Sequence, residues 1–345
     1  METMSLGPLE VSRLCLGTML MGDKTPAAEA HRMLDTFVAA GGTFVDTADV
    51  YGDGHSEETL RPWLAANRDA VVVATKLRMK VSDPPGQGLA PDRVRAACDA
   101  SLRRLGIDTI DLYQVHAPDP ETPLEEALDA LDGLVQAGKV RALGVSNFPA
   151  WLLAWSIALQ DHEGWSPFVS LQPQYSLVER SIEGEILPFC RAAGLGVLPW
   201  GPLGAGFLTG KYAHGDAPPA GSRIADAADG LEEALHRRGT KANFRAAEEA
   251  RALAEEVGAT VAQVSLAWLL SVDGVTAPIV GPRTIEQLED LLGAAQLRLG
   301  EEQLLRLDAP TRPPATYPQR MLSEQLGLGD LGGLVRRSGR SGAPS

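Results

Sequence analysis

Ala70-Val71-Val72-Val73-Ala74-Thr75-Lys76 is the stretch that decides the fold: a short apolar run ends in a lysine, and a segment of helical periodicity follows over 90–105. Short apolar runs between polar or turn residues are typical of strands buried on both faces of a parallel sheet. Runs of this kind recur along the chain and predict strands over 13–17, 43–46, 70–75, 110–115, 142–145, 169–172, 196–200 and 277–281.

A segment with helical periodicity follows each of these runs. The predicted helices lie near 27–40, 56–67, 90–105, 124–137, 150–161, 182–193, 245–271 and 284–294. Strands that alternate with helices in this way favour a closed parallel barrel over an open sheet. The sequence therefore predicts a (β/α)8 TIM barrel, whose functional residues should stand at the carboxyl ends of the strands.

Further segments flank or interrupt the barrel. Residues 5–12 contain a Gly7-Pro8 turn and predict an N-terminal hairpin that plugs the barrel bottom. Residues 201–240 form a long insertion after the seventh strand, and a loop of that length is usually functional or disordered. We expect one barrel domain over 1–310, with a helix over 301–307, and a C-terminal extension over 311–345 that is mobile from Gly327 and contributes to a homo-oligomer or to the active site.

The composition narrows the class of protein. The 345-residue chain has a formal net charge of −14, which argues against a nucleic-acid partner. No apolar run approaches about 18 residues and no signal peptide is evident, so we expect no membrane span. The three cysteines are widely spaced and odd in number, which fits reduced thiols of a cytoplasmic protein better than disulfides or a metal site.

Side chains suited to proton chemistry stand at or just beyond three successive strand ends: Asp46, Tyr51, Lys76 and His116. A tyrosine hydroxyl is a weak acid at neutral pH, and a lysine cation beside it favours the phenolate. A carboxylate would keep that lysine charged and in place. A histidine could position a carbonyl oxygen or relay a proton.

Each of these residues alone also has a plain structural interpretation. Asp46 could cap a helix, and Tyr51 could be a wall residue. Lys76 could be the solvated end of a strand, and His116 could be a buried histidine with its hydrogen bonds satisfied. Together, complementary side chains at successive strand ends are hard to place by chance. The sequence has no Cys/His metal spacing, no G-x-S-x-G elbow and no G-x-G-x-x-G opening a strand–helix unit.

Longer motifs surround these residues: FVDTADVYG (44–52), ATK (74–76), DLYQVH (111–116), GVSNF (144–148), QPQYS (172–176) and WGPLGAGFLTG (200–210). With these motifs the sequence resembles the aldo-keto reductase superfamily from about residue 5 to residue 300. The resemblance implies a catalytic tetrad of Asp46, Tyr51, Lys76 and His116 and the cofactor NADPH. It also implies that the nicotinamide carboxamide is held by Ser146, Asn147 and Gln172, with Trp200 stacked on the ring.

The resemblance extends to the rest of the cofactor. It implies that the pyrophosphate receives backbone N–H groups of Leu203 and Gly204. The adenosine end, with its 2′-phosphate near a helix N-terminus, would be held by Gly281, Arg283, Thr284 and Gln287. The sequence departs from the family pattern at Trp200, usually Tyr, at Gly201, often Ser, and at Leu291, often an adenine-contacting Asn. These departures concern cofactor affinity and leave the tetrad intact.

The function predicted from the sequence is NADPH-dependent reduction of an aldehyde or ketone, with a small-molecule carbonyl substrate. A ketone on a bacterial natural product, either a polyketide side chain or a deoxysugar, is one candidate. Met19, Leu20, Met21, Trp151 and Phe207 suggest a partly apolar substrate pocket. Two alternatives remain: a cofactor-binding regulatory or interaction subunit, which turnover assays would separate, and a metal- or phosphate-dependent isomerase or lyase, which would need ligand clusters at several strand ends.

Overall fold

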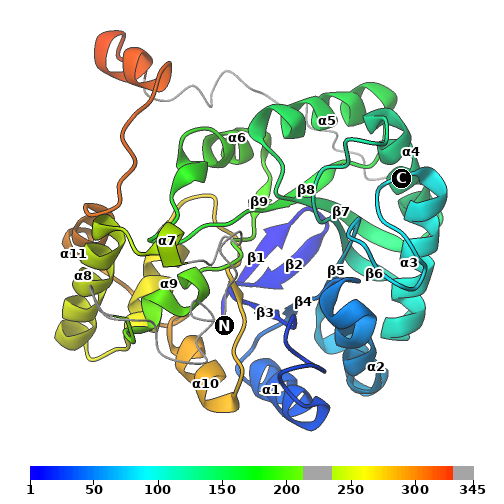
Figure 1. The fold of residues 1–345 in the computed structure, drawn as a ribbon, viewed down its shortest axis with the longest axis horizontal. Helices are drawn as coiled ribbons and strands as arrows, with labels where there is room; N and C mark the ends of the chain where they lie inside the picture. Colours follow the sequence, from blue (N-terminus) through cyan, green and yellow to red (C-terminus); the bar gives the residue numbers. More distant parts are fainter. Residues whose placement is uncertain (213–234, 329–345) are drawn as a thin grey trace.

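The structure of the protein is a computed structural model, in which residues 1–212 and 235–328 are described. Its main sheet is a ring of parallel strands in the order β10-β3-β4-β5-β6-β7-β8-β9 (Figure 1). The ring closes through a bridge between Val197 and Val275, and the N–H of Ile279 donates to the carbonyl of Pro199 at 2.8 Å. The prediction of a (β/α)8 barrel is confirmed.

The strands of the barrel are short and match the predicted apolar runs. They are β3 (Cys15–Gly17), β4 (Phe44–Asp46), β5 (Val72–Leu77), β6 (Ile110–Val115), β7 (Val140–Ser146), β8 (Phe168–Gln172), β9 (Gly196–Val197) and β10 (Ile279–Val280). Their apolar side chains are almost all buried, which is expected for a parallel sheet covered on both faces.

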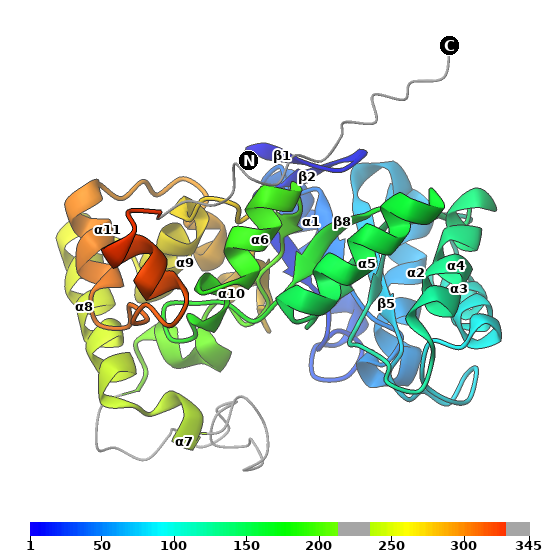
Figure 2. The ribbon, with the colours of Figure 1, turned by 90° about the horizontal axis from the view of Figure 1, so that it is seen from above.

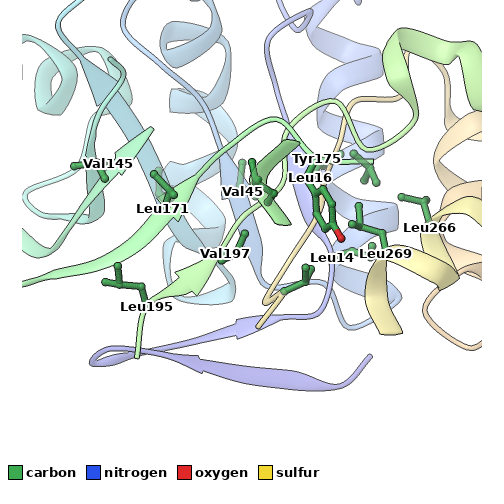
Figure 3. Close-up of a cluster of buried hydrophobic side chains, with 14 of the residues drawn as sticks. Leu14, Leu16, Val45, Val145, Leu171, Tyr175, Leu195, Val197, Leu266 and Leu269 are labelled. Atoms are coloured by element: carbon green, nitrogen blue, oxygen red, sulfur yellow. The ribbon is translucent and has the colours of Figure 1, made fainter. Parts of the chain in front are cut away.

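Helices surround the ring on the outside, except for the short α7 (Leu235–Arg238), which lies at one end of the barrel (Figures 1 and 2). The surrounding helices are α1 (Ala27–Ala39), α2 (His55–Asn67), α3 (Pro91–Leu105), α4 (Leu124–Gln136), α5 (Ala150–Glu163), α6 (Ile186–Ala193), α8 (Lys241–Val257), α9 (Val261–Ser271), α10 (Ile285–Gly293) and α11 (Glu301–Asp308). Apolar side chains between strands and helices form one large cluster. Figure 3 shows part of it, with Leu266 and Leu269 of α9 near Leu14.

An N-terminal hairpin closes one end of the barrel, as predicted. It pairs β1 (Thr3–Leu6) with β2 (Leu9–Ser12) and lies across the centre of the ring (Figure 1). Leu6, Leu9 and Val11 pack with interior residues of the strands in a second apolar cluster. The turn residue Gly7 has φ +58°, and a Cβ there would lie 2.4 Å from Val169, so close packing also requires a glycine.

The single helix predicted over 245–271 is wrong: this region is two helices, α8 and α9, bent by 101° at the break. Gly258 ends α8 in the left-handed conformation, with φ +66°. Thr260 then starts α9 through a capping box with Gln263. In a sequence, a glycine signals the end of one helix and a capping box signals the start of the next. Here the apolar periodicity continues across both signals and conceals the break.

The two ends of the barrel differ in character. Figure 2 shows the hairpin at one end and α7, which follows the seventh barrel strand, at the other. The predicted helix over 301–307 is present as α11. Beyond it lies one π-helical turn at Met321–Gln325. Most of the 201–240 insertion and the tail predicted to be mobile fall outside the described residues.

No single helix in the described ranges is long and apolar enough to cross a membrane. One bent pair, α8 with α9, passes that test by length and composition alone.

Candidate active site

A buried lysine lies at the centre of the site. Lys76, on β5, is fully buried, and its Nζ donates to Asp46 Oδ1 at 2.5 Å, to the Thr47 carbonyl at 2.8 Å and to the Tyr51 hydroxyl at 3.2 Å. Asp46 ends the neighbouring strand β4, and the two strands pair in parallel register. Neighbouring strand ends therefore bring the carboxylate, the ammonium and the phenol into one chain of contacts, as the sequence predicts.

The backbone after β4 turns sharply to place Tyr51. A short 3-10 turn spans Tyr51–Gly54, and within it Gly52 and Asp53 have φ near +58° and +57°. The phenol ring lies beneath a cation, because Lys76 Nζ is 4.8 Å from the ring centroid. Tyr51 also lines the cavity described below.

The charge state of Lys76 follows from two opposing effects. Burial alone would lower the pKa of Lys76, but the negative charge of Asp46, with a smaller effect of Tyr51, outweighs burial and raises that pKa above its ordinary value. The ammonium therefore stays charged at neutral pH and faces the Tyr51 oxygen. A cation in that place stabilises the phenolate that remains after proton loss.

His116 stands beside Tyr51 as a neutral imidazole. The two rings meet edge to face, with centroids 5.9 Å apart and planes at 85°. Burial, together with the charges of Lys76 and Arg78, lowers the pKa of His116 to about 3. Its Nδ1 is buried without a hydrogen-bond partner among the described residues. A neutral histidine can donate one hydrogen bond to an oxygen without adding a charge.

The residues predicted to hold the nicotinamide lie next to one another at the ends of β7, β8 and β9. The Ser146 hydroxyl donates to the Gln172 carbonyl at 2.7 Å, and Asn147 Nδ2 donates to the His116 carbonyl at 3.0 Å. Asn147 adopts φ +59°, an unusual conformation that Asn tolerates. Its Oδ1 accepts from the Trp200 indole N–H at 3.0 Å, which fixes the edge of the indole.

These residues line one cavity of about 720 Å³. Of the residues predicted for the pyrophosphate and adenosine, Leu203, Gly281, Arg283 and Gln287 line it. Gly204 and Thr284 do not. The Gly204 N–H donates to the Gly201 carbonyl at 2.9 Å, while the Thr284 side chain caps α10 by accepting from the Gln287 N–H at 3.3 Å.

The predicted apolar pocket is present in part. Met19, Leu20 and Met21, which follow β3, line the cavity. Trp151 and Phe207 do not: Trp151 is 71% exposed on α5, and Phe207 is buried in a stack with Tyr212. The loop after β3 and Trp200 therefore both wall the cavity.

Sequence reasoning missed two further cations that line this cavity, Lys211 and Arg238, of which Arg238 forms an ion pair with Glu179. Lys211 lines the cavity together with Arg283, and the pKa of Lys211 is lowered by partial burial and then by the charge of Arg283. Among the described carboxylates none forms an ion pair with either side chain. Lys211 directly follows the motif WGPLGAGFLTG (200–210), but no periodicity in that part of the sequence indicates where the Lys211 side chain lies.

Comparisons with known proteins identify the family of the chain. The model of the aldo/keto reductase family matches residues 13–311. The chain is 39% identical to the uncharacterized oxidoreductase YrpG of Bacillus subtilis over 87% of its length and 92% of that protein. It is 34% identical to norsolorinic acid reductase stcV of Emericella nidulans, over 92% and 83% of the two chains. It is 30% identical to versiconal hemiacetal acetate reductase of Aspergillus parasiticus, over 92% of this chain and 99% of that protein. With a barrel that carries this set of residues and a family match over most of its length, the chain belongs to the aldo/keto reductase family of oxidoreductases.

Proposed function

We propose that the protein is an NADPH-dependent carbonyl reductase in which Tyr51 donates the proton. The observation that carries the proposal is the chain of contacts Asp46–Lys76–Tyr51, placed beside neutral His116 at the wall of a cavity of about 720 Å³. Acid–base groups that face a cavity are what carbonyl reduction requires.

The residues of the cavity fit a nicotinamide dinucleotide. Tyr51, the amides of Asn147 and Gln172 and the cations Lys211 and Arg283 all line the cavity. A bound cofactor supplies a hydride to the carbonyl carbon. The cations Lys211 and Arg283 support NADPH over NADH, because a 2′-phosphate adds negative charge to the cofactor and guanidinium groups bind phosphate in bidentate geometry.

In the proposed step, the carbonyl carbon gains hydride while its oxygen gains a proton, and an alcohol results. Tyr51 protonates the oxygen, and Lys76 stabilises the phenolate left behind. Asp46 holds Lys76 charged. Neutral His116 is placed to donate a hydrogen bond to the same oxygen, which aligns the carbonyl with Tyr51.

For the substrate we propose a natural-product ketone that the apolar loop after β3 can cover. Met19, Leu20 and Met21 offer flexible apolar walls, and methionine side chains adapt to irregular shapes. Two relatives are named as reductases of norsolorinic acid and of versiconal hemiacetal acetate, which supports this class.

The direct test is turnover. Purified protein is assayed with NADPH and with NADH against aldehydes, simple ketones, keto sugars and aromatic polyketide ketones, and oxidation of the cofactor is followed by absorbance. We expect alcohol product with NADPH and at least one ketone. Tight NADPH binding with no product from any carbonyl would instead favour the regulatory subunit.

A further inference from the structure

Gln114 lies behind the site, in the interior of the barrel. It is fully buried on β6, where it pairs in register with Lys76 on one side and with Gly144 on the other. Gly144 makes room for it, because a Cβ there would lie 3.2 Å from Gln114 Cγ and 2.3 Å from the Ser170 hydroxyl. A long polar side chain therefore occupies the layer directly beneath the reacting groups.

The side-chain amide of Gln114 belongs to a network around the second oxygen of Asp46. Asp46 Oδ1 accepts from Lys76, while Oδ2 accepts from Gln114 Nε2 at 3.0 Å and from Gln172 Nε2 at 2.9 Å. Gln172 Nε2 also donates to Gln114 Oε1 at 3.3 Å. The carboxylate thus holds one ammonium and two amide donors.

This network fixes the orientation of both amides. An ionised carboxylate only accepts hydrogen bonds, so each amide must turn its nitrogen toward Asp46. Gln172 then uses both N–H groups of Nε2, one on Asp46 and one on Gln114. Its Oε1 is left as the group that Gln172, which lines the cavity, can present there. A nicotinamide carboxamide offers an NH2 donor to such an acceptor.

We propose that Gln114 is a positioning residue of the reductase. It keeps Asp46 as a fully satisfied carboxylate under Lys76, and it sets the amide of Gln172 with its acceptor toward the cofactor. The inference rests on the proposed function, because it assigns the carboxamide end of a cofactor to Gln172. Gln114 touches neither substrate nor cofactor and acts only through Asp46 and Gln172.

Two variants separate this role from simple packing. Gln114→Met keeps the length but removes every donor and acceptor. We expect kcat to fall about 10-fold and the KM for NADPH to rise several-fold, because a hydrogen bond to a charged group is lost at Asp46. Gln114→Glu keeps the shape and places a second carboxyl group against Asp46. Two carboxyl groups in contact share one proton, so the variant should work when that proton is present and fail when it leaves.

The expected signature is a new ionisation in the pH profile. Gln114→Glu should keep kcat within a few-fold of wild type near pH 6 and lose at least about 10-fold relative to wild type near pH 8. Gln160 provides the matched control. It is equally buried, on α5, and among the described residues its amide bonds only the Ser166 carbonyl and the Phe168 N–H. Gln160→Met and Gln160→Glu should lower the melting temperature and leave the pH profile and the KM for NADPH unchanged.

The result that overturns the inference is a wild-type kcat, KM for NADPH and pH profile in both Gln114 variants, or the same changes in the Gln160 variants. If Gln114→Met does not fold, the pH profile of Gln114→Glu alone decides whether Gln114 is a positioning residue. Failure of the proposed function is a different outcome: the wild type then turns over no carbonyl. In that case NADPH binding, measured by tryptophan fluorescence, decides for Gln114, because Gln114→Met should still weaken it several-fold.

Discussion

Tyr51 and Lys76 should behave as one acid–base unit, because the Lys76 ammonium donates directly to the phenol oxygen. Tyr51→Phe keeps the ring and removes the proton, so we expect kcat to fall by about 10²–10⁴-fold with NADPH binding nearly unchanged. Lys76→Met should be comparably impaired, and the two losses should not add in the double variant. Rates come from NADPH absorbance and binding from quenching of Trp200 fluorescence. Near wild-type turnover by Tyr51→Phe would show that another group supplies the proton.

His116 should make the protein less stable in acid. The folded protein holds it neutral, with its pKa lowered to about 3, whereas the unfolded chain protonates it near its ordinary value of 6.5. Its contribution to stability is therefore fully present above pH 6.5 and is lost progressively as the pH falls toward 3.

The matching measurement compares wild type with His116→Asn. Between pH 6.5 and about 5, the wild type should lose about 2 kcal/mol more of its unfolding free energy than the variant, as one extra proton binds to the unfolded chain. Denaturant unfolding at both pH values gives the difference. Equal losses in the two proteins would mean that His116 is protonated in the folded state or that other groups dominate.

Arg283 and Lys211 should decide the choice between NADPH and NADH. Both line the cavity, and a 2′-phosphate would meet their charge. We expect Arg283→Ala to raise the KM for NADPH about 10-fold or more while barely changing that for NADH, since a charge-assisted contact is removed. Lys211→Ala should also raise the KM for NADPH more than the KM for NADH, but by a smaller factor than Arg283→Ala. Equal loss with both cofactors would place Arg283 in folding rather than in phosphate binding.

The ease of predicting a site residue depended on where it lies relative to its strand. Asp46, Lys76 and His116 stand at strand ends, where polar residues after apolar runs are conspicuous, and Tyr51 follows within a motif. Gln114 lies inside an apolar strand, so the apolar pattern of that strand predicts only that the position is buried. Its role depends on hydrogen bonds to strands 68 and 58 residues away in sequence, which no local pattern reveals.

At the scale of elements, local signals placed most helices and strands, and tertiary context decided the exceptions. The helix predicted over 182–193 begins only at Ile186, because a 3-10 turn at Ser181–Glu183 comes first. The break between α8 and α9 was missed because Ala, Leu and Val continue through it. Gly258 and Thr260 outweigh this periodicity, since a left-handed residue ends the hydrogen-bond ladder whatever the apolar pattern.

The contribution of Gly258 to the break between α8 and α9 can be measured as a change in the unfolding free energy. Nothing lies within 4 Å of a Cβ built there, so only its φ of +66° opposes a side chain. Gly258→Ala should therefore lower the unfolding free energy by about 1 kcal/mol. Gly133→Ala is the control: it lies inside α4, it too has open space, and its φ is not positive, so the change should stabilise by about 0.5–1 kcal/mol. Both are measured by denaturant unfolding. Stabilisation by Gly258→Ala, as by Gly133→Ala, would contradict the role given to the left-handed cap.

The whole molecule has a C-terminal segment that leaves the barrel. α11 is anchored, because Asp308 forms an ion pair with Arg180, whose guanidinium stacks 4.7 Å from the Trp268 ring centroid. After α11 the chain projects away from the ring of helices (Figure 1). Tyr317, Leu326 and Leu328 are then 75%, 57% and 49% exposed, although apolar side chains of this size normally find a surface to cover.

We therefore expect the protein to form a homo-oligomer through this segment. Light scattering should give a mass of at least two chains for the full-length protein and a smaller mass for a chain ending at Pro314, which keeps α11 and its anchor. The double variant Tyr317→Ser with Leu326→Ser should also have a smaller mass than the full-length wild type, since the two changes remove apolar contact without shortening the chain. NADPH binding should survive in every form, because none of the changed residues lines the cavity. A single-chain mass for the full-length protein, with turnover equal to that of the shortened chain, would leave the segment with no part in assembly or in the active site.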